Sequence, residues 1–306
     1  MTTVRVTLQP TRCAVCGTEN NATELYPANF DFAAFNPAIF SARRLPDRIH
    51  LRMVRCNACR LVRADPMAEA AALSELYRQS TFDYSGEVEN LKQTYGRYLA
   101  KLDSLGAKKC ALLEIGCGNG FFLEQAIAQG YKNVRGVEPS IEAISRAAPA
   151  VRDRIVRDVM RPGLFAENEF DVICLFQVFD HLPDPAAVLA ECRLTLKLGG
   201  FLLILNHNVE ALSARILGER SPIIDIEHTY LYSPRTLSQF VKKHRFIPRA
   251  SGAVWNSYTL QYLARLVPFP APLKRAKLAF LNATRLGKIR LRVPLGNLWL
   301  AAQKTT

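Results

Sequence analysis

The chain has 306 residues, which is enough for one large or two modest domains. Hydrophobic residues make up 49% and charged residues 22%, and no apolar run approaches the roughly 18 residues that a membrane span needs, which excludes an integral membrane protein. Arg and Lys outnumber Asp and Glu by 13, and the whole excess lies in residues 241–306, which have no acidic residue. The amino-terminal residues lack the apolar core of a secretory signal, so we expect a cytoplasmic protein.

Residues 1–66 contain two Cys-x-x-Cys pairs, Cys13 with Cys16 and Cys56 with Cys59. Each pair can place two thiolates at one tight turn, and two such turns complete a tetrahedral zinc site. Four thiolates leave no open coordination position, so the zinc would be structural. A thioredoxin-like redox pair is the alternative, but it needs a βαβ context that this segment lacks. We therefore predict a small zinc-knuckle domain.

The rest of the chain is predicted to be a helical connector, 67–104, followed by alternating strands and helices from 105 to 306. The predicted strands are 111–115, 134–137, 154–156, 170–176, 201–205, 246–254 and 298–303, and the predicted helices are 121–129, 141–148, 185–197 and 234–244. Alternation of this kind is typical of a doubly wound α/β fold, with a mostly parallel sheet and helices on both faces.

Three glycines, Gly116, Gly118 and Gly120, stand between the strand 111–115 and the next helix. Glycines let the backbone turn sharply and approach a ligand closely, and the amides at a helix start attract an anionic group. A dinucleotide fingerprint would need its third glycine where Phe121 stands, so NAD is disfavoured.

This loop resembles the first motif of class I S-adenosylmethionine-dependent methyltransferases, in which an acidic residue precedes three alternating glycines. The resemblance extends over residues 111–240 and implies S-adenosylmethionine as cofactor and a seven-stranded sheet in the order 3-2-1-4-5-7-6, with strand seven antiparallel. In the family, the carboxylate here at Glu138 holds both ribose hydroxyls, and the one at Asp158 contacts the adenine amino group. The implied cofactor-binding residues are Glu114, Gly116, Cys117, Gly118, Asn119, Gly120, Glu138, Pro139, Asp158, Val159, Phe176 and Gln177.

A four-cysteine domain ahead of this core resembles the deoxysugar C-methyltransferases and related small-molecule methyltransferases. Their first pair also reads Cys-x-x-Cys-Gly, and their second pair also precedes a Leu-Val segment and a proline, here Leu61-Val62 and Pro66. Those enzymes have a further carboxy-terminal domain of about a hundred residues or more, for which this chain is too short.

Methyl transfer requires alignment of donor and acceptor and, for many acceptors, removal of a proton. Histidine is the usual base near neutral pH. In the resembling family a Glu-His segment lines the acceptor pocket, and in the sugar enzymes it supplies the base. This implies His228 as the base, Glu227 as its partner and His181 as second candidate. A packing role for His228 remains the alternative.

The expected function is methyl transfer from S-adenosylmethionine to the oxygen or carbon of a small-molecule or glycosyl acceptor. One alternative, an RNA methyltransferase, is suggested by the cysteines and the basic end. However, residues 206–208 read Asn-His-Asn rather than Asn/Asp-Pro-Pro-aromatic, so nucleic acid is not the expected partner. The other alternative is an S-adenosylmethionine-binding protein without turnover.

An insertion at about 256–296 carries eight basic residues and no acidic one. We expect a basic, partly amphipathic helix beyond Pro272. It would serve as a lid over an anionic substrate, or contact an anionic membrane surface that carries a lipid-linked one. A solvated basic face without a partner is the third interpretation.

Overall fold

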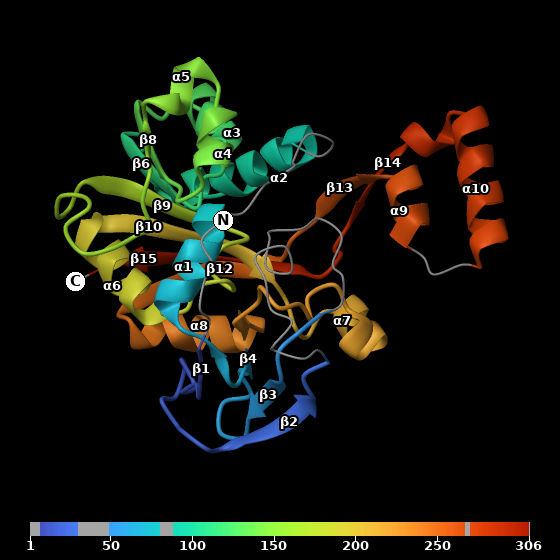
Figure 1. The fold of residues 1–306 in the computed structure, drawn as a ribbon. Coiled ribbons are helices and arrows are strands. Elements are labelled where there is room, and N and C mark those ends of the chain that lie inside the picture. Colours follow the sequence, from blue (N-terminus) through green and yellow to red (C-terminus); the bar gives the residue numbers. More distant parts are fainter. Residues whose placement is uncertain (1–6, 30–48, 80–87, 267–269, 306) are drawn as a thin grey trace.

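The computed structural model describes residues 7–29, 49–79, 88–266 and 270–305 (Figure 1). At its centre lies a seven-stranded sheet in the order β12-β15-β10-β9-β6-β7-β8. In chain order its strands are β6 (Ala111–Ile115), β7 (Asn133–Val137), β8 (Ile155–Val156), β9 (Phe170–Phe176), β10 (Leu196–His207), β12 (Phe246–Ala253) and β15 (Asn297–Lys304). This is the order 3-2-1-4-5-7-6 that the resemblance implies, and β15 runs antiparallel to both of its neighbours.

Most observed bounds agree with the prediction to within one or two residues, and larger differences occur at two places. β10 begins earlier than expected, because Leu196 already pairs with Phe170 of β9 before a register shift. The chain after β7 is divided into two short helices: α4 (Ile141–Ser145), which ends before the predicted residue 148, and α5 (Pro149–Arg152), which lies outside the predicted range. Pro149 explains the division, since proline has no N–H with which to continue a preceding helix.

Helices cover both faces of the sheet (Figure 1). α2 (Val88–Ala100) and α3 (Phe121–Ala128) pack on one face, while α6 (Pro185–Thr195) and α8 (Pro234–Lys243) pack on the other. Successive strand residues alternate between the two cores, as expected for a sheet buried on both sides.

The starts of α6 and α8 are fixed by polar caps. Asp184 accepts the amide of Ala187 at 3.0 Å, so α6 begins at Pro185 as the sequence predicts. Ser233 and Thr236 form a reciprocal capping box at the start of α8. The cap of α6 places its first turn against the pocket described below.

The amino-terminal residues form a second, four-stranded sheet in the order β11-β4-β3-β2. Its strands are β2 (Ala22–Tyr26), β3 (Met53–Cys56), β4 (Val62–Ala64) and β11 (Tyr230–Leu231). β11 comes from the carboxy-terminal half of the chain and pairs antiparallel with β4, with Tyr230 opposite Arg63. The predicted zinc-knuckle segment 1–66, of which 1–6 and 30–48 lie outside the described residues, therefore shares its sheet with the predicted catalytic region.

The predicted connector 67–104 has two helices with different partners. It opens with β5 (Met67–Ala68), which pairs with β1 (Leu8–Gln9) of the amino-terminal part. α1 (Ala70–Gln79) packs Leu73 and Leu76 into the core beneath the second sheet, whereas α2 packs on the central sheet. A short 3-10 helix, η2 (Asp103–Leu105), follows α2. The connector therefore packs on both sheets.

Residues 256–296, which we call the arm, extend away from the central sheet (Figure 1). The arm is built from β13 (Asn256–Thr259), α9 (Leu260–Leu266), α10 (Ala271–Ala283), η4 (Leu286–Lys288) and β14 (Arg290–Val293). α10 confirms the helix that the sequence predicts beyond Pro272. Two further elements, α7 (Leu212–Leu217) and η3 (Gly218–Arg220), lie between β10 and β11. Across the described ranges, each helix is too short or too polar to cross a bilayer.

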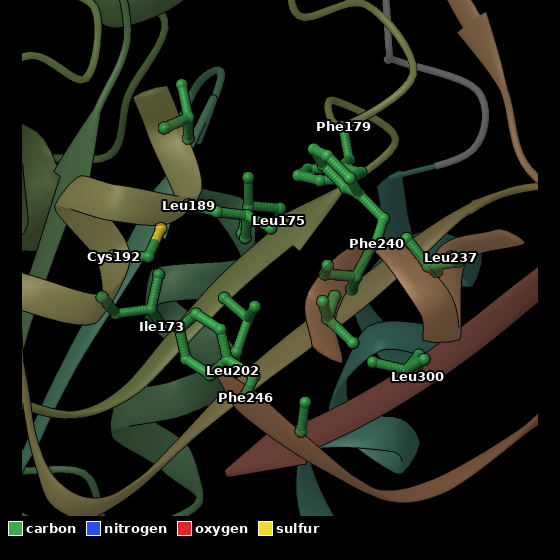
Figure 2. Close-up of a cluster of buried hydrophobic side chains, with 14 of the residues drawn as sticks. Ile173, Leu175, Phe179, Leu189, Cys192, Leu202, Leu237, Phe240, Phe246 and Leu300 are labelled. Atoms are coloured by element: carbon green, nitrogen blue, oxygen red, sulfur yellow. The ribbon is translucent and has the colours of Figure 1, made fainter. Parts of the chain in front are cut away.

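The core beneath α8 is a continuous set of buried side chains (Figure 2). Leu237 and Phe240 of α8 are fully buried against the sheet, where Ile173 and Leu300 belong to the same cluster. Such a core loses both transfer free energy and packing contacts when a large side chain is removed.

We expect Phe240→Ala to lower the free energy of unfolding by about 3–5 kcal/mol, since the ring is 0% exposed and its loss leaves a cavity. Denaturant unfolding measures the change. Phe280→Ala is the matched control, because that ring is 59% exposed and its removal should change the free energy by less than about 0.5 kcal/mol. Equal effects of the two substitutions would contradict this assignment of the core.

Candidate active site

The glycine loop lies between β6 and α3. Gly116, Gly118 and Gly120 have φ values of +71°, +54° and +73°, which L side chains rarely adopt. The amide of Gly116 donates to the carbonyl of Val137 at 2.8 Å, which ties the loop to the end of β7. A Cβ on Gly116 would collide with the side chain of Val178. The loop can therefore keep this path only with glycine at position 116.

Glu138 follows β7 and is held in one orientation by the glycine loop. Its Oε2 accepts the amide of Gly118 and its Oε1 accepts the amide of Ser140, both at 2.9 Å. Burial raises the pKa of Glu138, and the two amides act in the opposite direction. Each carboxylate oxygen has a further lone pair, so the fixed group can still accept hydrogen bonds from a vicinal diol.

Asp158 follows β8, the strand that pairs with β7, and Glu138 follows β7. Its Oδ1 accepts the amide of Val159 and its Oδ2 accepts Nε of Arg161, each at 2.8 Å. Burial opposes ionisation, but the Val159 amide and the Arg161 charge together lower the pKa of Asp158. The group is therefore a charged, oriented acceptor.

One pocket gathers many of the predicted cofactor residues. Those that line it are Gly116, Glu138, Pro139, Asp158, Val159, Phe176 and Gln177. The others lie behind this lining, in β6 and the glycine loop: Glu114, Cys117, Gly118, Asn119 and Gly120. The thiol of Cys117 is buried in the core beside Gly136, so this residue can serve the pocket only through its backbone.

Three buried oxygens near the glycine loop suit a cationic ligand. Oε2 of Glu114, Oδ1 of Asn119 and Oε1 of Gln177 have no hydrogen-bond partner among the described residues. Burial, and then the charge of Glu138, raise the pKa of Glu114. Buried acceptors without donors are costly. S-adenosylmethionine has an ammonium group and ribose hydroxyls that donate hydrogen bonds, so the residues present fit this cofactor.

The pocket has a volume of about 480 Å³ and extends beyond the cofactor residues. Its far half is formed by α1, the loop after β9, the end of β10 and the segment that precedes β11. Polar side chains converge there from these elements: Tyr77, His181, His207, Asp225, Glu227 and His228. The volume is in the range of small-molecule sites.

Three histidines meet in this half. The ring of His228 lies 4.6 Å from that of His181 and 4.7 Å from that of His207, measured between centroids. The hydroxyl of Tyr77 lies 3.0 Å from Nδ1 of His181. The structure thus brings His228 and His181 together in the pocket, which Glu227 also lines.

The surroundings of His228 and His181 favour their neutral forms. Burial, and then the proximity of His181 and His207, lower the pKa of His228 well below its usual 6.5. Burial also lowers the pKa of His181. A neutral imidazole has a free lone pair, so His228 is in the protonation state that a base requires.

Asp180 joins the elements around this cluster. Its Oδ2 accepts Nδ1 of His207 at 2.6 Å, and its carbonyl accepts the amides of Thr229 and Tyr230 at 2.9 and 3.2 Å. Burial would raise its pKa, but His207 and the neighbouring histidines lower it far below the usual range. Because Tyr230 begins β11, Asp180 connects the pocket to the amino-terminal sheet.

Sequence reasoning did not assign roles to Tyr77, Asp180 and His207. Tyr77 occupies a helical core position beside Leu76, which indicates packing rather than chemistry. Asp180 directly precedes His181 in a loop, and nothing in the sequence shows that its side chain faces His207. The position of His207 at the end of a parallel strand was the one available signal.

The four predicted zinc ligands are also brought together. Sγ of Cys13 lies 3.3 Å from that of Cys59, Sγ of Cys16 lies 3.5 Å from that of Cys56, and all four lie within 4.8 Å of one another. This spacing suits a tetrahedral four-thiolate site. Cys13, Cys56 and Cys59 are buried in the same core as α6 and α8.

Comparison with known proteins identifies the family. Residues 88–246 match a family described as a methyltransferase domain. The chain belongs to this methyltransferase family. With its fold and the cofactor half of its pocket, it is an S-adenosylmethionine-dependent methyltransferase.

Two similar proteins are named ubiquinone biosynthesis O-methyltransferases. The one from Stutzerimonas stutzeri is 30% identical over 187 residues, covering 58% of this methyltransferase and 74% of the relative. The one from Paracidovorax citrulli is 27% identical over 217 residues, covering 65% and 89%. A solved complex of the Haloferax volcanii Trm112 methyltransferase activator with a methyltransferase matches with a TM-score of 0.50 and 16% identity, over 72% of this chain and 92% of that one. At this identity the match shows the fold alone.

We expect Gly118→Arg to abolish S-adenosylmethionine binding in titration calorimetry. The buried position has φ +54°, and a guanidinium there would pair with Glu138 in the place of the ribose. Gly106→Arg is the control, because Gly106 also has positive φ, +87°, but open space around its Cβ position. The control should bind normally, and normal binding by both variants would overturn the cofactor site.

Proposed function

We propose that this methyltransferase transfers the methyl group of S-adenosylmethionine to an oxygen of its acceptor, with His228 as the base. The observation that supports this most directly is a neutral, buried histidine in the far half of the pocket that also contains Glu138 and Asp158. The two relatives that are named O-methyltransferases favour oxygen over carbon.

The bound cofactor supplies a methyl group on a positively charged sulfur. Glu138 would accept hydrogen bonds from the ribose hydroxyls of the cofactor, and Asp158 would contact its adenine. The acceptor hydroxyl would lie in the far half, where His228 would take its proton as the oxygen–carbon bond forms and the carbon–sulfur bond breaks. The bonding electron pair would stay on the sulfur, which becomes a neutral thioether, so charge and atoms balance.

The neighbours of His228 have positioning roles in this scheme. Tyr77 contacts Nδ1 of His181, and Asp180 accepts a hydrogen bond from Nδ1 of His207. These contacts fix the rings on either side of His228. Glu227 lies next to it in the same loop and adds negative charge that favours the imidazolium formed after proton transfer.

We expect His228→Ala to lower kcat by about 10²–10⁴-fold while the affinity for S-adenosylmethionine stays unchanged. Formation of S-adenosylhomocysteine with a panel of phenols and glycosides first finds a working acceptor, and calorimetry measures cofactor binding. Because the pKa of His228 is lowered, the free base persists below pH 6.5, so kcat/KM should stay level from pH 7 to 6.

His244→Ala is the control, since His244 packs on Phe240 away from the pocket. It should keep full activity. A loss below about tenfold in His228→Ala would return His228 to a packing role and favour His181. A tenfold fall of kcat/KM between pH 7 and 6 would indicate a base with a higher pKa.

The acceptor that we propose is a small, anionic or lipid-linked molecule, reached at an anionic membrane surface. The relatives act in ubiquinone biosynthesis by name, and the basic arm supports an anionic partner. A sugar acceptor is the second candidate, supported by the four-cysteine domain and the Glu227-His228 segment. The test panel therefore contains both classes.

The four cysteine thiolates, in this proposal, hold one structural zinc ion. The ion would join the turn at Cys13 to the turn at Cys56, and β4 begins three residues after Cys59. Since β4 pairs with β11, the zinc site stabilises the strand that begins two residues after His228. Metal binding would then be coupled to the geometry of the far half of the pocket.

We expect about one equivalent of zinc per chain in elemental analysis of protein purified without chelators. Cys16→Ser should lose the metal and lower turnover, while the affinity for S-adenosylmethionine changes less than about threefold, because the cofactor residues stand on the central sheet. Cys110→Ser, which removes an exposed thiol outside the cluster, is the control. Wild-type protein without metal, or a metal-free variant with full turnover, would contradict the coupling.

A further inference from the structure

The arm combines positive charge with exposed apolar side chains. It carries eight basic residues, Arg265, Lys274, Arg275, Lys277, Arg285, Lys288, Arg290 and Arg292, and no acidic residue. Among its described side chains, Leu273, Phe280, Leu286, Ile289 and Leu291 are between 41% and 59% exposed. Isolated exposed leucines are ordinary, but this density on one projecting segment is not.

The apolar exposure continues onto the adjoining part of the enzyme. Trp255, directly before the arm, is 52% exposed, and Leu212 and Ile216 of α7 are 71% and 72% exposed. α7 lies near the base of the arm, because a Cβ on Gly296 would stand 3.1 Å from Oγ of Ser213 in α7. Nine of the fourteen large exposed apolar residues of the described chain thus belong to α7, Trp255 and the arm.

The two ends of the arm are joined to each other beside α2. β13 and β14 form a four-residue antiparallel ladder from Asn256 opposite Val293 to Thr259 opposite Arg290. Where the chain enters the arm, the side chain of Arg97 in α2 donates to the carbonyl of Trp255 at 2.9 Å. The arm therefore leaves the body of the enzyme next to α2.

The charge of the arm favours one kind of partner. A second copy of this chain would bring the same positive arm, and residues 1–240 contain equal numbers of acidic and basic residues, so they offer no net negative charge. Nucleic acid would match the charge but not the exposed leucines and phenylalanine. An anionic bilayer matches both features, because basic side chains contact its headgroups while apolar ones enter the interface.

We propose that the arm and α7 form a docking surface for an anionic lipid bilayer. Leu273 and Phe280 of α10 enter the interface, and Lys274, Arg275 and Lys288 contact the headgroups. The role of this docking rests on the proposed function, because docking would bring the pocket to a lipid-linked acceptor. The binding itself depends only on the arm.

The test is co-sedimentation of the whole enzyme with vesicles of phosphatidylglycerol and phosphatidylcholine, compared with phosphatidylcholine alone. We expect binding to the anionic vesicles at 50 mM salt and its loss at 1 M, where the screening length falls to about 3 Å. At about 1 kcal/mol per basic residue, Lys274→Glu/Arg275→Glu/Lys288→Glu should lower the partition coefficient at least a hundredfold.

Lys108→Glu/Lys132→Glu/Arg235→Glu, with the same change in net charge at exposed sites elsewhere, should bind nearly as the wild type. The apolar variant Leu273→Ser/Phe280→Ser should also lower binding, by at least tenfold. All variants should bind S-adenosylmethionine normally, which separates failure of docking from failure of the catalytic proposal.

Three results would overturn the docking surface. The first is no binding to anionic vesicles at low salt. The second is an equal loss in both triple variants, which would mean that net charge alone decides. The third is tighter binding of a single-stranded RNA oligonucleotide that the apolar variant leaves unchanged, or an arm-dependent dimer in light scattering, since either would assign the surface to another partner.

Discussion

The arrangement of the far half of the pocket depends on the hydrogen bonds of Asp180. This fully buried residue uses its carboxylate to hold His207 and its carbonyl to hold Thr229 and Tyr230. It thereby fixes three segments: the loop after β9, the end of β10 and the start of β11. His228 lies among them, so its position follows from these hydrogen bonds together with that of its own amide to the carbonyl of Asp225 at 3.2 Å. A buried carboxylate that lost its partners would be expensive, which makes this arrangement strongly preferred.

Most of the central sheet could be predicted from the sequence because its signals are local. The glycine loop needs positive φ at three positions, and the end of an apolar strand fixes where the loop begins. The carboxylates Glu138 and Asp158 follow neighbouring parallel strands, so strand order alone brings them to one edge. The start of α6 could also be predicted, since the pair Asp184-Pro185 is typical of a helix start. Each of these predictions depends on a few adjacent residues.

The rest required contacts between distant parts of the chain. The pairing of β11 with β4 joins residues more than 160 positions apart, and two-residue strands leave no periodicity to recognise. The sequence did not predict a role for Tyr77 in the pocket, because a tyrosine at a helical core position indicates packing. The boundary after residue 66 stays a prediction: the segment looks independent by composition, while its sheet and its core are completed by residues near 230 and by α1.

The location of the positive charge bears on what the enzyme must attract. S-adenosylmethionine is itself a cation, with its ammonium and sulfonium outweighing one carboxylate, so a basic arm does not serve its capture. Glu138 and Asp158 already supply carboxylates at the proposed cofactor half. In the proposed docking, the arm's charge therefore serves the surface where the other substrate resides. Since salt confines electrostatic attraction to about 8 Å under physiological conditions, a projecting basic arm is effective only toward something that it touches. A broad anionic surface in contact with α10 meets that condition without requiring the arm to close over the pocket.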